Sequence, residues 1–305
     1  MNRFVLKHGT QSLFALLCLL VLVFFLARLT GDPTDLYLPM DASIEQRAEF
    51  AASHGFDDPV VVQFGRYLAG VMRFDFGDSL FQGRPAIDAV LAAFPVTLKL
   101  AGVTMALSLV LAIVIGSLAA WRPRSIFDRV ASMLTIASAS APDFWVAIVA
   151  ILVFAVSLGW LPTSGMGSPA HWIMPVGVLM FRPLGLLTQV VRAAMIGALA
   201  APYVKTARAK GAGKSRIIFV HGLRNAMLTV ITVAGDQAAT LINGAVVVET
   251  VFGWPGIGNL MIQAIQQRDF AVLQACILMT AFAIFFMNVL IDIAYSRLDP
   301  RVRTS

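Results

Sequence analysis

The segment Gly211-Ala-Gly-Lys-Ser215 ends in Gly-Lys-Ser, as does the phosphate-binding loop Gly-x-x-x-x-Gly-Lys-Ser. The complete loop needs a glycine at position 208, where this chain has Arg208, and a β-strand before it, for which the sequence has no pattern. We therefore expect this chain to bind no cofactor and not to hydrolyse ATP itself. The chain is not predicted to be an enzyme.

Residues that most often bind metals or perform nucleophilic catalysis are few and scattered. They are His8, His54, His171, His221, Cys18 and Cys276. Their spacing matches neither a metal site nor a catalytic triad. No metal site is predicted.

Two charged residues fall within otherwise apolar segments, where an isolated charge is costly and usually faces a cavity or a partner. Counted from the basic ends of their segments, Arg182 lies ten residues deep and Asp236 twelve. At about 1.5 Å per residue, their depths differ by roughly 3 Å. An ion pair or a polar wall of a translocation path is one hypothesis. Separate contacts with a second subunit or with water are an equally open alternative.

Two other acidic residues lie at the ends of apolar segments, Asp143 at one and Glu249 at another. Both are expected at a membrane interface, within reach of water.

The composition indicates an integral membrane protein of the all-α class. Apolar residues make up 58% of the 305 residues and charged residues only 13%. The net charge of +6 could suggest a nucleic-acid partner, but the cations flank apolar segments, which is what the positive-inside rule produces. The lipid bilayer is therefore the predicted environment, and no nucleic-acid partner is expected.

Six transmembrane helices are predicted because about 20 apolar residues cross a bilayer. They cover residues 9–27, 100–121, 142–158, 172–191, 226–248 and 270–291. The first lacks the small-residue pattern of a cleaved signal peptide. Residues 192–224 hold seven Lys or Arg and no acid, which places that segment, and with it both termini, in the cytoplasm.

Residues 31–96, between the first helix (1–30) and the core (97–305), are predicted to form a small extracytoplasmic helical insertion. The segment has ten acidic residues and four arginines. Ser43 with Gln46 is typical of a capping box, and Asp58-Pro59 of the start of a second helix. That second helix should carry an apolar stripe of Val61, Phe64, Leu68 and Val71, which favours packing over ligand binding.

Two motifs resemble permease subunits of ABC importers of the peptide, nickel and opine branch. The first lies in the predicted cytoplasmic loop 192–225, and its residues are Tyr203, Thr206, Ala207, Arg208, Ala209, Lys210, Gly211, His221, Leu223, Arg224 and Asn225. The second lies in the predicted outer loop 249–269, where Glu249, Phe252, Pro255, Gly256 and Gly258 are candidates for outer gating or docking. The wider family has Glu-Ala-Ala-x-x-x-Gly in the first loop, of which this chain keeps Ala207 and Gly211.

The resemblance implies a type I importer permease in a bacterial inner membrane. The loop would form a short coupling helix that rests on a cytoplasmic ATPase. The implied partners are a second, related permease subunit, two ATPase subunits that use the ATP, and an extracytoplasmic solute-binding protein. Di- or oligopeptides are the implied solutes, with nickel chelates or another small solute as the alternative.

Other functions stay open on the residues alone. A self-sufficient ion-coupled transporter would use Arg182 and Asp236 as coupling residues. A membrane scaffold or sensor has little support, because the sequence shows no signalling domain. The basic loop could also serve only to fix topology and contact lipid headgroups.

Overall fold

The computed structural model describes residues 14–298, apart from residues 16, 26–37, 39–41 and 80. In this part of the chain four helices are long and apolar enough to cross a membrane. They are α5 (Ala86–Trp121), α8 (Ala170–Ala200), η2 with α10 (Arg216–Val251) and residues 270–291 of α12 (Phe270–Leu298). The predicted first span, residues 9–27, lies mostly outside the described residues, although residues 17–25 are helical.

A fifth candidate span is bent. Helix α6 (Ile126–Ser140) meets α7 (Asp143–Ala150), which continues as the π-helix η1 (Ile151–Ser157), at an angle of 107°. Ala141 and Pro142 between them have extended backbones. Ala141 is extended because a residue before proline avoids the helical region, and Pro142 takes the cap position of α7. The predicted span 142–158 is therefore only one arm of this pair. The count of six membrane helices stays a prediction.

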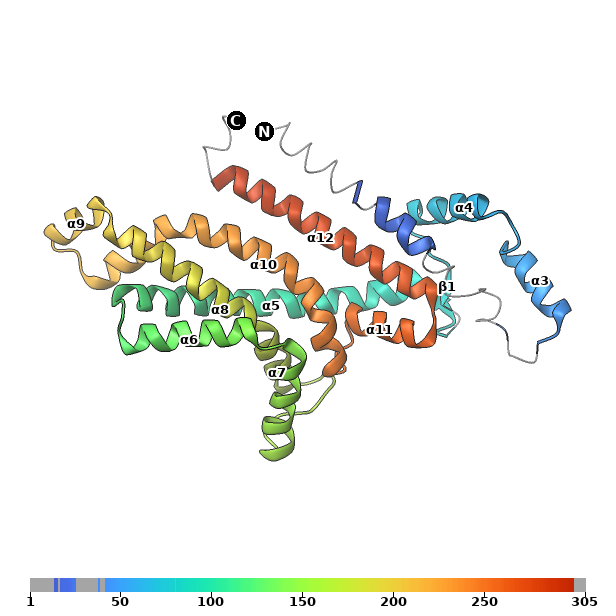
Figure 1. Cartoon of the computed structure of the whole chain (residues 1–305), viewed down its shortest axis with the longest axis horizontal. Coiled ribbons are helices and arrows are strands. Elements are labelled where there is room, and N and C mark those ends of the chain that lie inside the picture. The colour runs from blue at the N-terminus through green and yellow to red at the C-terminus, as the bar shows by residue number, and fades with distance from the viewer. Residues whose placement is uncertain (1–13, 16, 26–37, 39–41, 80, 299–305) are drawn as a thin grey trace. The chain divides into compact units, whose positions relative to one another are not determined.

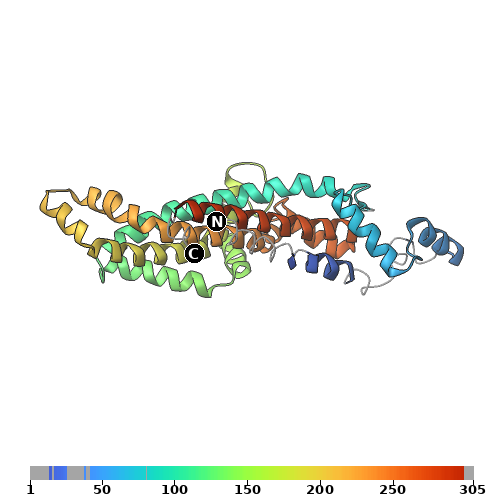
Figure 2. The same cartoon turned by 90° about the horizontal axis from the view of Figure 1, so that it is seen from above.

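The chain forms two compact units, and α5 and α12 contribute to both. The first unit holds residues 97–255 and the chain from Phe286 onward. Its central helix is α8, which packs against α6 and α10, while α7 contacts α8 and α10 (Figures 1 and 2). The short helix α9 (Pro202–Ala209) follows α8, and the π-helix η2 (Arg216–Gly222) leads into α10 (Leu223–Val251). This unit contains the predicted coupling loop.

Small residues allow the helices of the first unit to approach closely. A Cβ on Gly116 of α5 would lie 2.7 Å from the carbonyl oxygen of Thr188 in α8. A Cβ on Gly235 of α10 would lie 2.9 Å from the side chain of Ile291 in α12. Close approach at small residues is a usual way for membrane helices to associate.

The second unit holds the chain up to Val96 and the segment Gly256–Phe285. Its elements are α3 (Ile44–His54), α4 (Val60–Met72), the strands β1 (Asp78–Ser79) and β2 (Arg84–Pro85), the start of α5, α11 (Ile257–Gln267) and the start of α12. The strands pair antiparallel, with Asp78 opposite Pro85. The core is formed by α5, α11 and α12, through residues such as Val90, Ile257 and Cys276.

The two helices predicted within residues 31–96 are confirmed, while an extracytoplasmic insertion stays a prediction. The Ser43–Gln46 capping box is present at the start of α3. Helix α4 starts one residue later than predicted, because Pro59 takes the cap position. In its apolar stripe Phe64 packs against Phe24, with ring centroids 5.0 Å apart, whereas Val61 is 82% exposed. Helix α5 begins at Ala86, inside the segment predicted as insertion.

Candidate functional site

Helix α9 presents a polar, basic face. Val204 is its buried anchor, and the helix contacts α8 and η2. The exposed residues that follow the anchor or flank it are Tyr203, Lys205, Thr206, Arg208, Ala209, Lys210 and Gly211, while Ala207 is half-buried. The helix starts with Pro202, whose fixed φ suits a first helical position. Its exposed cations are therefore held on a short, anchored helix.

Gly211 follows the end of α9 and turns the chain toward η2. Its φ is +79°, a left-handed conformation that favours glycine, and its N–H donates to the carbonyl of Arg208 at 2.9 Å. The loop that continues to Lys214 and Ser215 thus follows a helix, not a strand.

The base under α9 is well packed. The buried residues Ile218 of η2, Val191 and Met195 of α8, and Val230 of α10 belong to one apolar cluster. Gly222 lies so close to α8 that an added Cβ would be 3.0 Å from Met195 Cε. This packing joins η2 to α8 and α10, and α9 contacts α8 and η2 beside it.

The rest of the predicted loop motif lies at the start of α10. The Asn225 amide donates to the His221 carbonyl at 2.9 Å. Leu223 is half-buried, and Arg224 and Asn225 are exposed. The structure thus brings the two halves of the motif to the same end of the helix pair α8 and α10.

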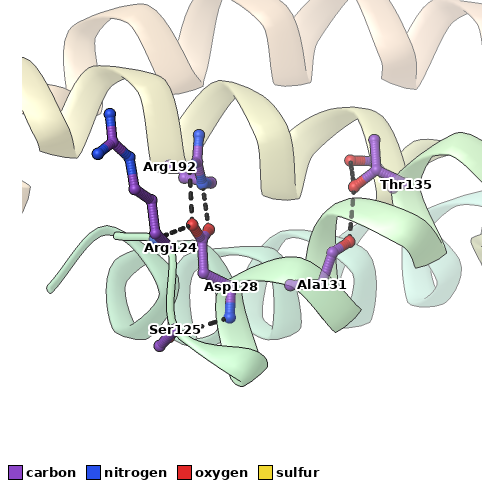
Figure 3. A network of polar contacts seen from close by, with 7 residues as sticks. Arg124, Ser125, Asp128, Ala131, Thr135 and Arg192 are labelled. Atoms are coloured by element: carbon purple, nitrogen blue, oxygen red, sulfur yellow. Dashed lines mark hydrogen bonds and ion pairs between the residues drawn. The ribbon is translucent and has the colours of Figure 1, made fainter. Parts of the chain in front are cut away.

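An ion pair that was not predicted lies between α6 and α8 (Figure 3). Asp128 is buried, and its carboxylate accepts two bonds from Arg192, one from Nε and one from Nη2 at 2.9 Å. It also accepts the backbone N–H of Arg124 at 2.8 Å. Ser125 caps α6 by accepting the N–H of Asp128 at 3.2 Å. The sequence carried one signal of this pair, an acid among the cations that follow the predicted second span.

The same two helices touch further along. Thr135 of α6 donates its hydroxyl to the Gly185 carbonyl at 3.2 Å, and to the Ala131 carbonyl of its own helix at 3.1 Å. A cavity of about 80 Å³ lies between the helices and is lined in part by Ser132, Thr188 and Arg192. Polar walls of this kind can hold ordered water.

At the other end of α10, a tight turn follows the helix. Glu249 is fully buried and accepts the hydroxyl hydrogen of Thr97 at 2.6 Å. Trp254 is also buried. Its backbone N–H donates to the Glu249 backbone carbonyl at 2.8 Å, and its ring packs edge-on against Trp172. Gly253 has a φ of +56°, which the turn requires.

This arrangement corrects the expectation that Glu249 lies at an interface within reach of water. The carboxyl is enclosed because the fold places the buried Thr97 of α5, which lies 152 residues earlier in the chain, against it. Phe252 is 1% exposed, whereas Pro255 is exposed. In the other unit, Gly256 caps α11 and Gly258 is buried in its first turn. Of the five residues predicted for outer gating or docking, only Pro255 is exposed to a docking partner. Their role in gating stays a prediction.

Arg182 and Asp236 are both exposed in the first unit. Within the described part of the chain, no hydrogen bond or ion pair joins them. Asp143, at the start of α7, is half-buried. The ion-pair hypothesis therefore finds no contact here, and the polar-wall hypothesis stays a prediction.

The second unit has its own buried polar contact. The hydroxyl of Ser79, at the end of β1, donates to Asp269 at 2.5 Å. Both residues are buried, and Asp269 also accepts the Val272 N–H at the start of α12. The contact fixes the hairpin to the start of α12.

Comparison with known proteins identifies the family. A family model described as "Binding-protein-dependent transport system inner membrane component" matches residues 112–304. The chain is 34% identical to the oligopeptide transport system permease protein AppB of Bacillus subtilis (strain 168), over 99% of each chain. It is 35% identical to the glutathione transport system permease protein GsiC of Salmonella paratyphi A (strain ATCC 9150 / SARB42), also over 99% of each.

The fold is shared with a solved structure, an amino acid ABC transporter with histidines. The TM-score is 0.53 at 16% identity, over 69% of this chain and 94% of that chain. The architecture is that of type I ABC importer permeases. Because the family model covers most of the sequence and the relatives match it from end to end, the chain belongs to the family of binding-protein-dependent transport system inner membrane components.

Proposed function

We propose that this chain is the permease subunit of an ATP-driven importer for di- and oligopeptides and forms half of the path through the membrane. It is a multi-pass inner membrane component. The observation that carries the proposal is the placement of α9, a short helix with an exposed basic face on a packed base formed by α8, η2 and α10. A helix held in this way can receive movement from a separate protein and pass it on as a rigid body.

The proposed partners follow because this chain forms the path and separate subunits use the ATP. Two ATPase subunits bind and hydrolyse the ATP, so this chain needs no cofactor of its own. One of them contacts α9, a second permease completes the path, and an extracytoplasmic binding protein delivers the solute. Both termini lie in the cytoplasm, as the cations around α9 favour.

The solute class is supported by the relatives. Two that match this chain from end to end are named as oligopeptide and glutathione permeases, and glutathione is itself a short peptide. We therefore propose peptides of two to several residues as the solutes.

Uptake by a strain that lacks the gene, with the chain supplied on a plasmid, tests the proposal. The wild-type chain should restore uptake of a labelled dipeptide, tripeptide or glutathione. Gly211→Val should lower that uptake by on the order of 10-fold, because a β-branched residue is strained at a φ of +79°. Gly213→Val is the matched control, since both glycines have open space around them but only Gly211 has a positive φ.

Two outcomes would overturn the proposal. One is the absence of peptide uptake with the wild-type chain. The other is peptide uptake by the purified chain alone in proteoliposomes, driven by a proton gradient without any ATPase, which would identify an ion-coupled carrier.

A further inference from the structure

The α5–α6 turn, residues 121–125, joins two helices that the sequence motifs do not include. It is tied at one end to α9. The guanidinium carbon of Arg208, in the last turn of α9, lies 5.5 Å from the centroid of the Trp121 ring. A cation over an indole ring is attracted to its electron-rich face. Arg208 therefore has a partner within its own chain.

The other end of the turn is tied to α8. Arg124 has a φ of +66°, unusual for a residue with a side chain, and its N–H is held by Asp128. Asp128 in turn forms the two-point ion pair with Arg192. A buried carboxylate with an ionised two-point donor is held more firmly than one with a single neutral bond.

These contacts close a ring. Arg192 lies ten residues before Pro202, so the chain runs from the ion pair along α8 into α9. From Arg208 the ring returns through Trp121 and the turn to Asp128. Helix α9 cannot tilt relative to α8 without breaking one of the two contacts or carrying α6 with it.

We propose that the α5–α6 turn passes the movement of α9 to α6, with Asp128 and Arg192 as positioning residues. This inference rests on the proposed function, because the movement originates in the ATPase that contacts α9. In the proposed importer, α6 and α8 then move as one body when α9 is displaced. Without the ion pair, the turn no longer ties α9 to α8, and α9 moves more freely relative to both α6 and α8.

The first test needs no transport. Hydrogen–deuterium exchange of the full chain in nanodiscs should show faster amide exchange in residues 203–209 for Asp128→Asn than for the wild type. Asp236→Asn, which alters an exposed carboxylate of α10, is the control and should leave that exchange unchanged. Arg192→Lys keeps the charge but loses the two-point geometry, and it replaces Asp128→Asn if that variant does not fold.

The second test uses the assembled importer. Asp128→Asn should leave assembly, ATP hydrolysis and the KM for the loaded binding protein near wild type, but lower the peptide transported per ATP by roughly 5-fold or more. A general loss of structure would lower all four. The double variant Asp128→Asn/Arg192→Gln should be no worse than the more impaired single variant, because both remove the same contact.

The outcomes separate the two proposals. Unchanged exchange in α9 together with an unchanged transport ratio would overturn the role of the turn, whatever the solute. Additive losses in the double variant would also overturn it. A wild-type complex that neither binds an ATPase nor transports peptide would overturn the proposed function, while faster exchange in Asp128→Asn would still support the ring of contacts.

Discussion

At Gly185 of α8, the structure allows the loss of stability caused by one added methyl group to be estimated. A Cβ at this position would lie 1.8 Å from Ser138 Oγ and 2.9 Å from Ser138 Cβ. Ser138 is 2% exposed, and its hydroxyl donates to the Thr135 carbonyl at 2.8 Å. The side chain of Ser138 is thus held in place, and Gly185→Ala must displace it or separate α6 from α8.

Three contributions set the magnitude. Overpacking of a well-packed contact costs about 1–3 kcal/mol. Loss of the Ser138–Thr135 hydrogen bond adds about 1 kcal/mol. Replacement of glycine by alanine in a helix offsets about 0.5–1 kcal/mol. We expect Gly185→Ala to lower the free energy of unfolding by about 1–3 kcal/mol.

Unfolding in mixed micelles, followed by tryptophan fluorescence as SDS is added, measures this change. Gly177→Ala is the matched control in the same helix, because nothing lies within 4 Å of its Cβ position. It should be neutral or slightly stabilising. Ser138→Ala in the Gly185→Ala background should restore part of the loss, since it removes the 1.8 Å contact but leaves the 2.9 Å one. If Gly185→Ala is as stable as Gly177→Ala, α6 and α8 do not approach as described.

Three further predictions concern buried polar groups. Thr97→Val removes a hydrogen bond from the buried carboxyl of Glu249 and should lower the free energy of unfolding by about 1–3 kcal/mol in the same SDS titration. Asp269→Asn weakens the acceptor for Ser79 and should speed proteolysis of the hairpin, residues 78–85, several-fold. Tyr67→Phe should keep or raise stability by up to about 1 kcal/mol, because the hydroxyl is buried without a hydrogen-bond partner among the described residues. Burial also raises the pKa of Tyr67 from 10.0 to about 12. Since the unfolded chain then loses its proton first, the wild type should lose stability between pH 10 and about 12, and Tyr67→Phe should lose less.

Exposed residues of the same types provide the controls. Thr240→Val alters an exposed threonine of α10, and Tyr203→Phe alters a tyrosine that is 41% exposed. Neither should change the free energy of unfolding by more than about 0.5 kcal/mol. Equal effects at Thr97 and Thr240 would contradict the burial of Glu249. A clear loss of stability in Tyr67→Phe would mean that the hydroxyl has a partner.

The sequence predicts the long apolar helices well because hydropathy depends only on neighbouring residues. The predicted last span, residues 270–291, begins at the first residue of α12 and lies within that helix. Helix α6 was missed, because its first residues carry charges and its second half is rich in Ala, Ser and Thr. Hydropathy alone places such a helix outside the membrane, and only its packing on α8 makes it part of the core.

Contacts between distant residues could not be predicted from local patterns. Asp128 and Arg192 lie 64 residues apart, and Thr97 and Glu249 lie 152 apart. The depth count for Arg182 and Asp236 gave similar heights, but it contains no information on the direction in which a side chain points. The position of α9 was predictable because the residues of its motif are consecutive. The glycine after it, Gly211, is also set locally, by its positive φ.

The π-helix η2 sets how far the residues before it are rotated about the helix axis relative to α10. A π-helical turn bonds residue i to i+5 and thus contains one residue more than an α-helical turn. One residue corresponds to about 100° around a helix axis. Deletion of a single residue at the exposed pair Phe219 and Val220 would let the turn relax to α-helix and would change the rotation of α10 relative to the residues before η2 by about 100°. The length of this segment is therefore as much a part of the proposed contact with the ATPase as the residues that α9 displays.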